Sequence, residues 1–264
     1  MTPILLLGAG RMGGALIAGW SKAGAFQPSD LIIRDPSAGP EARAAEAAGA
    51  RLNPPDDALK AARTVLLAVK PQVWREAAAA YAPLLAPDAV IVSIAAGVGA
   101  GPISEAFGGR AVARVMPTTG AAIGMGTASL YAAHSAARER ARALFAPVGT
   151  VVDLDDEDLM HAATAVSGSA PAYLYAFIEA LEAAGAKAGL APDAARDLAR
   201  STITGAAALL AQSGEDPAEL RRQVTSPGGT TQAALEVLMG AGGLPALLDR
   251  AVAAAVARSK ELGG

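Results

Sequence analysis

Cysteine is absent from this chain of 264 residues, and aromatic residues make up only 4% of it. Without cysteine the chain forms no disulfide and offers no thiolate ligand to a metal. Hydrophobic residues nevertheless reach 52%, and alanine contributes heavily to that figure. Because alanine favours helix and lets helices approach closely, the composition predicts a helix-rich globular protein. Since cysteine is absent, we also expect no metal site.

The chain also lacks an excess of positive charge. Its formal net charge is −3, with lysine and arginine scattered along it, so we expect no nucleic-acid partner. Residues 115–137 and 159–178 are uncharged windows long enough to cross a bilayer, but glycine, serine and proline interrupt both. We therefore expect no membrane span. The N-terminus shows no basic segment followed by a cleavable apolar one, which predicts a cytoplasmic protein.

The first half of the chain alternates between short apolar runs and alanine-rich stretches of helical length. The runs that predict strands are residues 4–7, 31–33, 65–69, 90–94 and 111–116. Such alternation is typical of a parallel sheet whose strands are joined by crossover helices. The pattern changes after Val151 and Val152, where the acidic segment Asp153–Asp158 suits the first turn of a helix.

The second half of the chain is predicted to be all helix. The expected segments are 156–187 with a bend near 168–171, then 192–212, 217–223, 228–239 and 244–261. We therefore predict two domains, residues 1–153 and residues 154–264. Because alanine-rich helices each bury little apolar area, we expect the helical domain to pair with a second copy, giving a homodimer or a higher homo-oligomer built on dimers.

Three glycines follow the first predicted strand and begin the first helix in the spacing GxGxxG. The first permits a tight turn, the second lets the backbone approach a pyrophosphate, and the third allows close packing of the helix. Free amides at the start of the helix would hold the phosphates. The pattern predicts a dinucleotide-binding Rossmann domain, and the alternative is that the glycines only form a turn. The cofactor-binding residues expected here are Gly8, Ala9, Gly10, Arg11, Met12 and Gly13.

The choice between NADH and NADPH depends on a pair of residues that directly follow the second predicted strand. Asp35 lies about twenty residues after the last glycine, where an acid would bond the ribose diol of NADH. Its neighbour Arg34 would instead pair with the 2′-phosphate of NADPH. Asp35 is alternatively a turn residue before Pro36. The two residues favour different cofactors, so the sequence does not decide between NADH and NADPH.

Further cofactor contacts are expected where later strands end, because ligands bind at the carboxyl edge of an open parallel sheet. The residues expected there are Ala68, Val69, Lys70, Pro71 and Ala95. Lys70 either faces the cofactor or is a solvated lysine that ends a strand. Small side chains around Ala95 would let a nicotinamide approach the backbone.

Four segments of the chain resemble motifs of one known family, pyrroline-5-carboxylate reductase. They are GAGRMGGAL at 8–16, VKPQ at 69–72, AVSGSAPAY at 165–173 and VTSPGGTTQAAL at 224–235. The last is the most specific, because the family signature has this SPGGTT core. The resemblance implies a reductase that makes proline from a cyclic imino acid, with hydride from NADPH or NADH. NADPH is slightly favoured by the family, whereas Asp35 favours NADH.

The resemblance also implies where the substrate binds. A glycine-rich loop before a helix can hold a carboxylate through free amides and hydroxyls. The substrate-binding residues expected are Ser226, Gly228, Gly229, Thr230 and Thr231. Thr231 is also the expected catalytic residue, since its hydroxyl would hydrogen-bond the ring nitrogen in a reaction that depends mainly on positioning. The alternative is an ordinary helix start, with Ser226 as its cap and Pro227 in its first turn.

One segment departs from the family pattern. Met, Pro, Asn, Thr and Pro usually follow the sixth strand in the family, whereas this chain has Met116, Pro117, Thr118, Thr119 and Gly120. Met116 and Pro117 match, and we expect both to contact the cofactor. The asparagine amide and the second proline have no counterpart here.

Two other functions fit the same outline. Hydroxyacid dehydrogenases also combine a Rossmann domain with a helical domain and use a helix lysine as the acid–base group. Lys187 is the candidate for that role, although the asparagine expected four residues later is absent. A non-catalytic dinucleotide-binding protein would keep the fold and lose turnover through the altered loop at 118–120. His134 and His161 lie in no motif, and we interpret both as structural.

Overall fold

The computed structural model describes residues 1–263, which form two compact units. The first contains residues 1–168 together with the chain from residue 254 onward, and the second contains residues 169–253. The predicted domains, 1–153 and 154–264, follow the change from strands to helices, and that division stays a prediction. The compact units divide the chain differently because α6 (Leu159–Ala163) and the last part of α11 (Leu244–Gly263) belong to the first unit.

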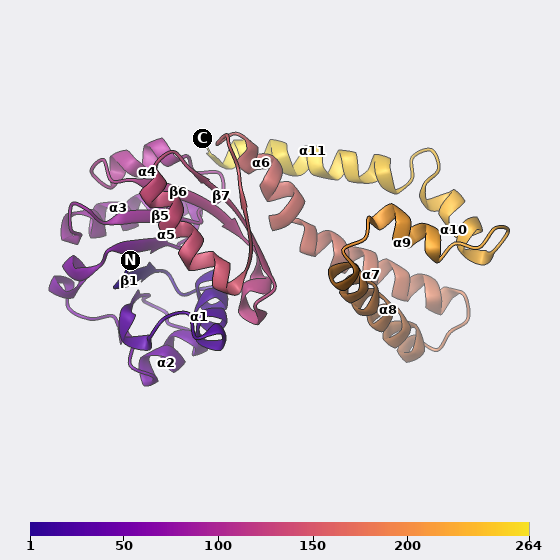
Figure 1. Ribbon diagram of the computed structural model, residues 1–264, viewed down its shortest axis with the longest axis horizontal. Coiled ribbons are helices and arrows are strands. Elements are labelled where there is room, and N and C mark those ends of the chain that lie inside the picture. Colours follow the sequence, from indigo (N-terminus) through magenta and orange to yellow (C-terminus); the bar gives the residue numbers. More distant parts are fainter. Residues whose placement is uncertain (264) are drawn as a thin grey trace. The chain divides into compact units, whose positions relative to one another are not determined.

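Within the described residues, the first unit contains one eight-stranded sheet (Figure 1). Its strands are β1 (Ile4–Leu7), β2 (Leu31–Arg34), β3 (Arg51–Leu52), β4 (Thr64–Leu67), β5 (Val90–Ser93), β6 (Val112–Pro117), β7 (Gly126–Ala132) and β8 (Gly149–Asp153). The order across the sheet is β3-β2-β1-β4-β5-β6-β7-β8. All neighbours are parallel except β6 and β7. The prediction of a mostly parallel Rossmann sheet is confirmed.

Strand β1 shows how the sheet is buried on both faces. Ile4 and Leu6 pack in one hydrophobic core, while Leu5 and Leu7 pack in another, because successive side chains of a strand point to opposite faces. None of the four is more than 1% exposed. The first core contains residues of α1 (Arg11–Ala23), α2 (Pro40–Ala47) and α5 (Ser135–Phe145), and the second those of α3 (Trp74–Tyr81) and α4 (Ala100–Ala106). Helices therefore cover both faces (Figure 1).

Strand β7 is the main element that the apolar runs do not predict. It is antiparallel to β6 and parallel to β8, and Gly126 at its start pairs with Gly149 at the start of β8. A Cβ on Gly149 would lie 1.9 Å from the carbonyl oxygen of Gly126. Glycine at these two positions marks a close approach of strands, although in the sequence it suggests a loop.

The second unit is all helical, as predicted for this part of the chain. It contains α7 (Ala170–Lys187), α8 (Pro192–Ser213), α9 (Pro217–Gln223), α10 (Thr230–Leu238) and the first part of α11. Proline stands in the first turn of α7, α8 and α9. Backbone N–H groups in a first turn have no acceptor within the helix, so proline loses no hydrogen bond there. Across residues 1–263, no helix combines the length and the hydropathy needed to cross a bilayer.

The bend predicted near residues 168–171 lies slightly earlier, as a π-helical turn over Thr164–Gly168. The hydroxyl of Thr164 donates to the carbonyl of Met160 over 2.7 Å, and the hydroxyl of Ser167 donates to the carbonyl of Ala163 over 2.8 Å. Hydroxyls that bond back onto the preceding turn in this way bend helices. The interruption therefore has a local cause in the sequence.

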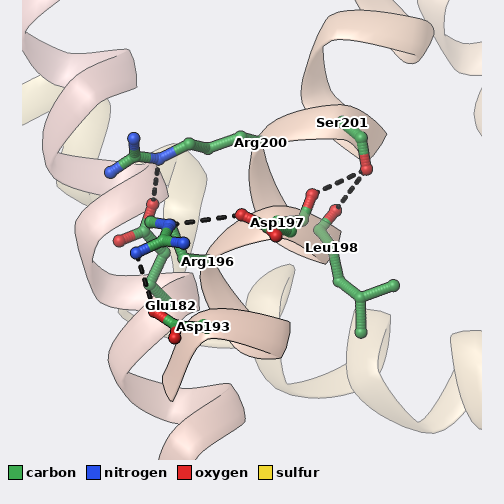
Figure 2. Close-up of polar contacts among 7 residues, drawn as sticks. All are labelled: Glu182, Asp193, Arg196, Asp197, Leu198, Arg200 and Ser201. Atoms are coloured by element: carbon green, nitrogen blue, oxygen red, sulfur yellow. Dashed lines mark hydrogen bonds and ion pairs between the residues drawn. The ribbon is translucent and has the colours of Figure 1, made fainter. Parts of the chain in front are cut away.

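Helices α7 and α8 are held together by a polar contact and by close packing. Figure 2 shows Arg200 of α8 donating to Glu182 of α7 over 2.7 Å. A Cβ on Gly185 of α7 would lie only 3.2 Å from the Cβ of Ala195 on α8. Ala195 and Ala199 are buried, so small side chains form this helix contact. The exposed ion pair adds little to it.

Replacing Gly19 with alanine tests the packing of α1. A Cβ at this position would lie 2.1 Å from the carbonyl oxygen of Ala121 and 2.8 Å from a methyl carbon of Val148. We expect Gly19→Ala to lower the free energy of unfolding by about 1–3 kcal/mol, as overpacking does. Gly101→Ala is the matched control, since a Cβ there meets nothing within 4 Å. Equal stability of the two variants in urea unfolding would contradict this account.

Candidate functional site

The glycine-rich loop joins β1 to α1 through a turn that requires glycine at position 8. Gly8 has a φ of +94°, and a Cβ on it would lie 2.8 Å from the carbonyl oxygen of Ala68 at the end of β4. A Cβ on Gly13 would lie 2.3 Å from the carbonyl oxygen of Gly8. Gly8 also donates its amide to the carbonyl of Arg34 over 2.9 Å. The loop is therefore pressed against the ends of β2 and β4.

Gly10 differs from the other two glycines, because a Cβ on it would meet no atom of the described residues within 4 Å. It is the N-cap of α1, and among the described residues no side chain caps this helix end. The first amides of a 13-residue helix thus remain available beside open space. That combination fits a phosphate group.

A cavity of about 310 Å³ adjoins this open space. It is lined by Gly10, Arg11, Met12, Ala68, Val69, Lys70, Ile94, Met116 and Pro117. The start of α1 and the carboxyl ends of β4, β5 and β6 supply these residues, at the edge where open parallel sheets bind ligands. A second cavity of about 510 Å³ lies along α1 and includes Ala9, Gly10 and Arg11. The structure thus brings together expected residues that are far apart in sequence.

Of the five residues expected at the ends of the later strands, two lie outside both cavities. Ala95 is only 5% exposed and packs in the hydrophobic core beneath α3 and α4, whereas its neighbour Ile94 lines the smaller cavity. Pro71 begins a 3₁₀ helix, Pro71–Val73, directly after Lys70. A shift of one residue at the end of a strand turns a side chain to the other face, which explains the exchange of Ala95 for Ile94.

Both oxygens of the Asp35 carboxylate accept backbone hydrogen bonds. One accepts the amide of Ala9 over 2.6 Å, and the other accepts the amide of Ser37 over 2.6 Å. Asn53, which the sequence analysis does not single out, donates its side-chain amide to the carbonyl of Asp35 and accepts the amide of Asp35. Asp35 therefore links the glycine-rich loop to the end of β2. Asn53 also has a positive φ of 46°, a conformation that asparagine tolerates.

Arg34, the other residue expected to choose the cofactor, forms an ion pair with Asp56. Its side chain is 16% exposed, and its Nε is buried without a hydrogen-bond partner within the described chain. Asp56 begins the 3₁₀ helix Asp56–Ala61, and α2 and β3 lie between this helix and Arg34 in the chain. No sequence motif predicts this pair.

The segment that departs from the family pattern is held by hydrogen bonds and close packing within the turn that it forms. The hydroxyl of Thr118 accepts the amide of Thr127 over 2.9 Å, and the amide of Thr118 donates to the carbonyl of Thr127 over 2.9 Å. A Cβ on Gly120 would lie 2.6 Å from the carbonyl oxygen of Met125. Thr118 and Gly120 therefore serve the turn between β6 and β7.

The loop expected to bind substrate lies in the second unit, before α10. Gly228 has a φ of +69°, and its amide donates to the side-chain oxygen of Gln232 over 2.7 Å. Gly229 is the N-cap of α10, whose start receives no side-chain cap among residues 1–263. Ser226 and Thr230 are exposed and Thr231 is partly buried. The loop thus presents hydroxyls and helix amides together, which suits a carboxylate.

His161 has a structural contact, as the sequence analysis interprets it. Its Nδ1 lies 2.9 Å from the hydroxyl of Ser259, which is 5% exposed on α11. Burial lowers the pKa of His161, and the positive charges of Arg114 and Lys260 lower it further. The contact holds the end of α11 on the first unit.

Arg114 is a buried charge that the sequence analysis does not identify. It lies on β6, is 5% exposed, and pairs with Glu157 over 2.7 Å. The same carboxylate oxygen accepts the amide of Ala100 at the start of α4. Glu157 therefore joins β6, α4 and the segment before α6.

Comparison with known proteins covers nearly the whole chain. Residues 157–262 match the family model described as pyrroline-5-carboxylate reductase dimerisation. Residues 3–97 match the model described as NADP oxidoreductase, coenzyme F420-dependent. A pyrroline-5-carboxylate reductase from Pseudomonas aeruginosa is 40% identical over 264 residues, covering 98% of this chain and 96% of the relative.

Solved structures agree with the sequence comparisons. A pyrroline-5-carboxylate reductase from Coxiella burnetii superposes with a TM-score of 0.89 at 30% identity, covering 100% of this chain and 99% of the other. A Plasmodium falciparum pyrroline carboxylate reductase with NADP bound gives a TM-score of 0.85 at 26% identity, covering 100% and 98%.

Replacing Gly10 separates ligand binding from folding. Because a Cβ on Gly10 meets no protein atom within 4 Å, we expect Gly10→Ala to unfold at the wild-type temperature. The added methyl would face the phosphate, so dinucleotide affinity should fall about tenfold or more, the loss of roughly one charge-assisted hydrogen bond. Calorimetric titration with NADPH and NADH measures this. Gly13→Ala should lose stability as well as affinity, and wild-type affinity in Gly10→Ala would place the phosphates elsewhere.

Proposed function

The chain belongs to the pyrroline-5-carboxylate reductase family, and from that membership we propose that it reduces Δ1-pyrroline-5-carboxylate to L-proline with a nicotinamide dinucleotide, the last step of proline biosynthesis. The observation that supports this most directly is the loop 226–231, which carries the family signature and leads into α10, a helix whose start receives no side-chain cap from the described residues. Hydride adds to the carbon of the C=N bond, and the ring nitrogen carries the proton that balances the reaction.

The first unit is proposed to bind the dinucleotide. The open space at Gly10 and the uncapped start of α1 fit a pyrophosphate, and Gly8 and Gly13 fit the turn that exposes those amides. When bound, the nicotinamide supplies the hydride. Lys70, Met116 and their neighbours around the cavity of about 310 Å³ would exclude water from its ring.

The second unit is proposed to bind the imino acid. The amides at the start of α10 and the hydroxyls of Ser226 and Thr230 would hold the substrate carboxylate, while Gly228 and Gly229 shape the loop. The hydroxyl of Thr231 would hydrogen-bond the ring nitrogen and keep the C=N bond in one orientation. An imine nitrogen can take its proton from solvent before hydride arrives, so positioning is the main contribution of these residues.

The family is dimeric through its helical part, and the exposed apolar surface of α7 supports the same assembly here. No residue of α7 is buried within the described single chain, and Leu174, Tyr175, Phe177 and Leu181 are exposed on it. Apolar patches of this kind mark protein interfaces. We propose a homodimer, or a higher homo-oligomer built on dimers, that uses α7.

The two alternative functions predict different kinetics. A hydroxyacid dehydrogenase would need Lys187, which ends α7, as its acid–base group. A non-catalytic protein would bind the dinucleotide without turnover. Oxidation of NADPH and NADH with pyrroline-5-carboxylate, beside a hydroxyacid panel and a blank without substrate, distinguishes the three. Imine-dependent oxidation supports the proposal, while activity on hydroxyacids alone, or no turnover at all, rejects it.

Replacing Thr231 tests the proposed contact with the ring nitrogen. Thr231→Ala should lower kcat/KM by roughly 10- to 100-fold, as expected for loss of a hydrogen bond to a charged group. Thr231→Ser keeps the hydroxyl and should recover most of that loss. Dinucleotide affinity, measured by calorimetry, should stay unchanged in both. Wild-type turnover and substrate KM in Thr231→Ala would remove the hydroxyl from the mechanism.

A further inference from the structure

Asp56 forms an ion pair with an arginine at the end of the second strand, the position at which Rossmann folds distinguish NADPH from NADH. The adenosine ribose of a dinucleotide lies at the end of the second strand of a Rossmann fold, where an acid binds the diol and an arginine binds a 2′-phosphate. Arg34 and Asp35 occupy that place here. Because Arg34 already pairs with Asp56, its positive charge is compensated before any cofactor arrives.

The backbone between β3 and Asp56 is held in place independently of the ion pair. The backbone N–H of Asn53 donates to the carbonyl of Ile33 over 2.8 Å, and the side chain of Asn53 bonds both the backbone amide and the carbonyl of Asp35. These bonds join the end of β3 to the end of β2. Asp56 lies three residues after Asn53, so these bonds place its carboxylate beside Arg34.

The resulting charges disfavour a phosphate. Arg34, Asp35 and Asp56 together carry one negative charge, since one cation faces two carboxylates. A 2′-phosphate adds about two further negative charges beside them. The ribose diol of NADH instead donates hydrogen bonds, which Asp35 can accept while it retains its bonds to Ala9 and Ser37, because each carboxylate oxygen has two acceptor sites.

We propose that Asp56 is a specificity-determining residue that lowers the affinity for the 2′-phosphate of NADPH by holding Arg34 in an ion pair, and so favours NADH. The proposal rests on dinucleotide binding at residues 8–13, as proposed above. Asp56 acts through Arg34 and touches no reacting atom, so it is a positioning residue.

The test is Asp56→Asn, which removes the charge and keeps the size of the side chain. Its matched control is Asp57→Asn, the adjacent exposed carboxylate on the same 3₁₀ helix, which changes the net charge equally. Calorimetric titration with 2′,5′-ADP and 5′-AMP measures the 2′-phosphate preference without catalysis. In Asp56→Asn the affinity ratio should shift about fivefold toward 2′,5′-ADP, the size of a partly exposed charge interaction. KM for NADPH should fall relative to KM for NADH, with little change in kcat.

The outcomes separate this proposal from general charge effects and from the proposed reaction. An unchanged ratio in Asp56→Asn, an equal shift in Asp57→Asn, or a fall in 2′,5′-ADP affinity would each overturn it. Adding Arg34→Gln to Asp56→Asn should abolish the gain, and a gain that persists would show that Arg34 is not the group released. If the nucleotide ratio shifts as expected while pyrroline-5-carboxylate is not reduced, the proposed reaction fails and the role of Asp56 stands.

Discussion

The close approach of three backbone segments at Gly8 is the contact on which the first unit depends. The end of β4 lies where a side chain on Gly8 would have to be, and the carbonyl of Gly8 lies where a side chain on Gly13 would have to be. This approach brings the end of β4 and the start of α1 to one cavity. Gly10 meets no such restriction, so a single motif combines two glycines required by packing with one that leaves room for a ligand.

The elements with local causes could be predicted from the sequence, and those with non-local causes could not. Strand β1, its turn and α1 follow from an apolar run and a glycine spacing within about twenty residues. Strand β7 depends on antiparallel pairing with β6, and glycine at its start conceals it. Ile94 replaces Ala95 at the cavity because the exact end of β5 decides which face a side chain takes.

The candidate site shows the same division. The expected residues at the ends of β1, β4 and β6 gather around one cavity because sheet topology brings strand ends together. Asn53 and Asp56 lie 18 and 22 residues from their partners Asp35 and Arg34, in no recurring pattern. Thr118 and Gly120, the departures from the family motif, are explained by the turn that they form. The loop before α10 has the geometry of a helix start, and only the family resemblance gives it a substrate.

The path of the chain through its two units has a consequence for protein synthesis. The chain leaves the first unit after residue 168 and rejoins it at residue 254, where Ser259 is buried against His161. A ribosome must therefore produce the whole second unit before the first can close. Until then the surface around His161 stays uncovered on the nascent chain.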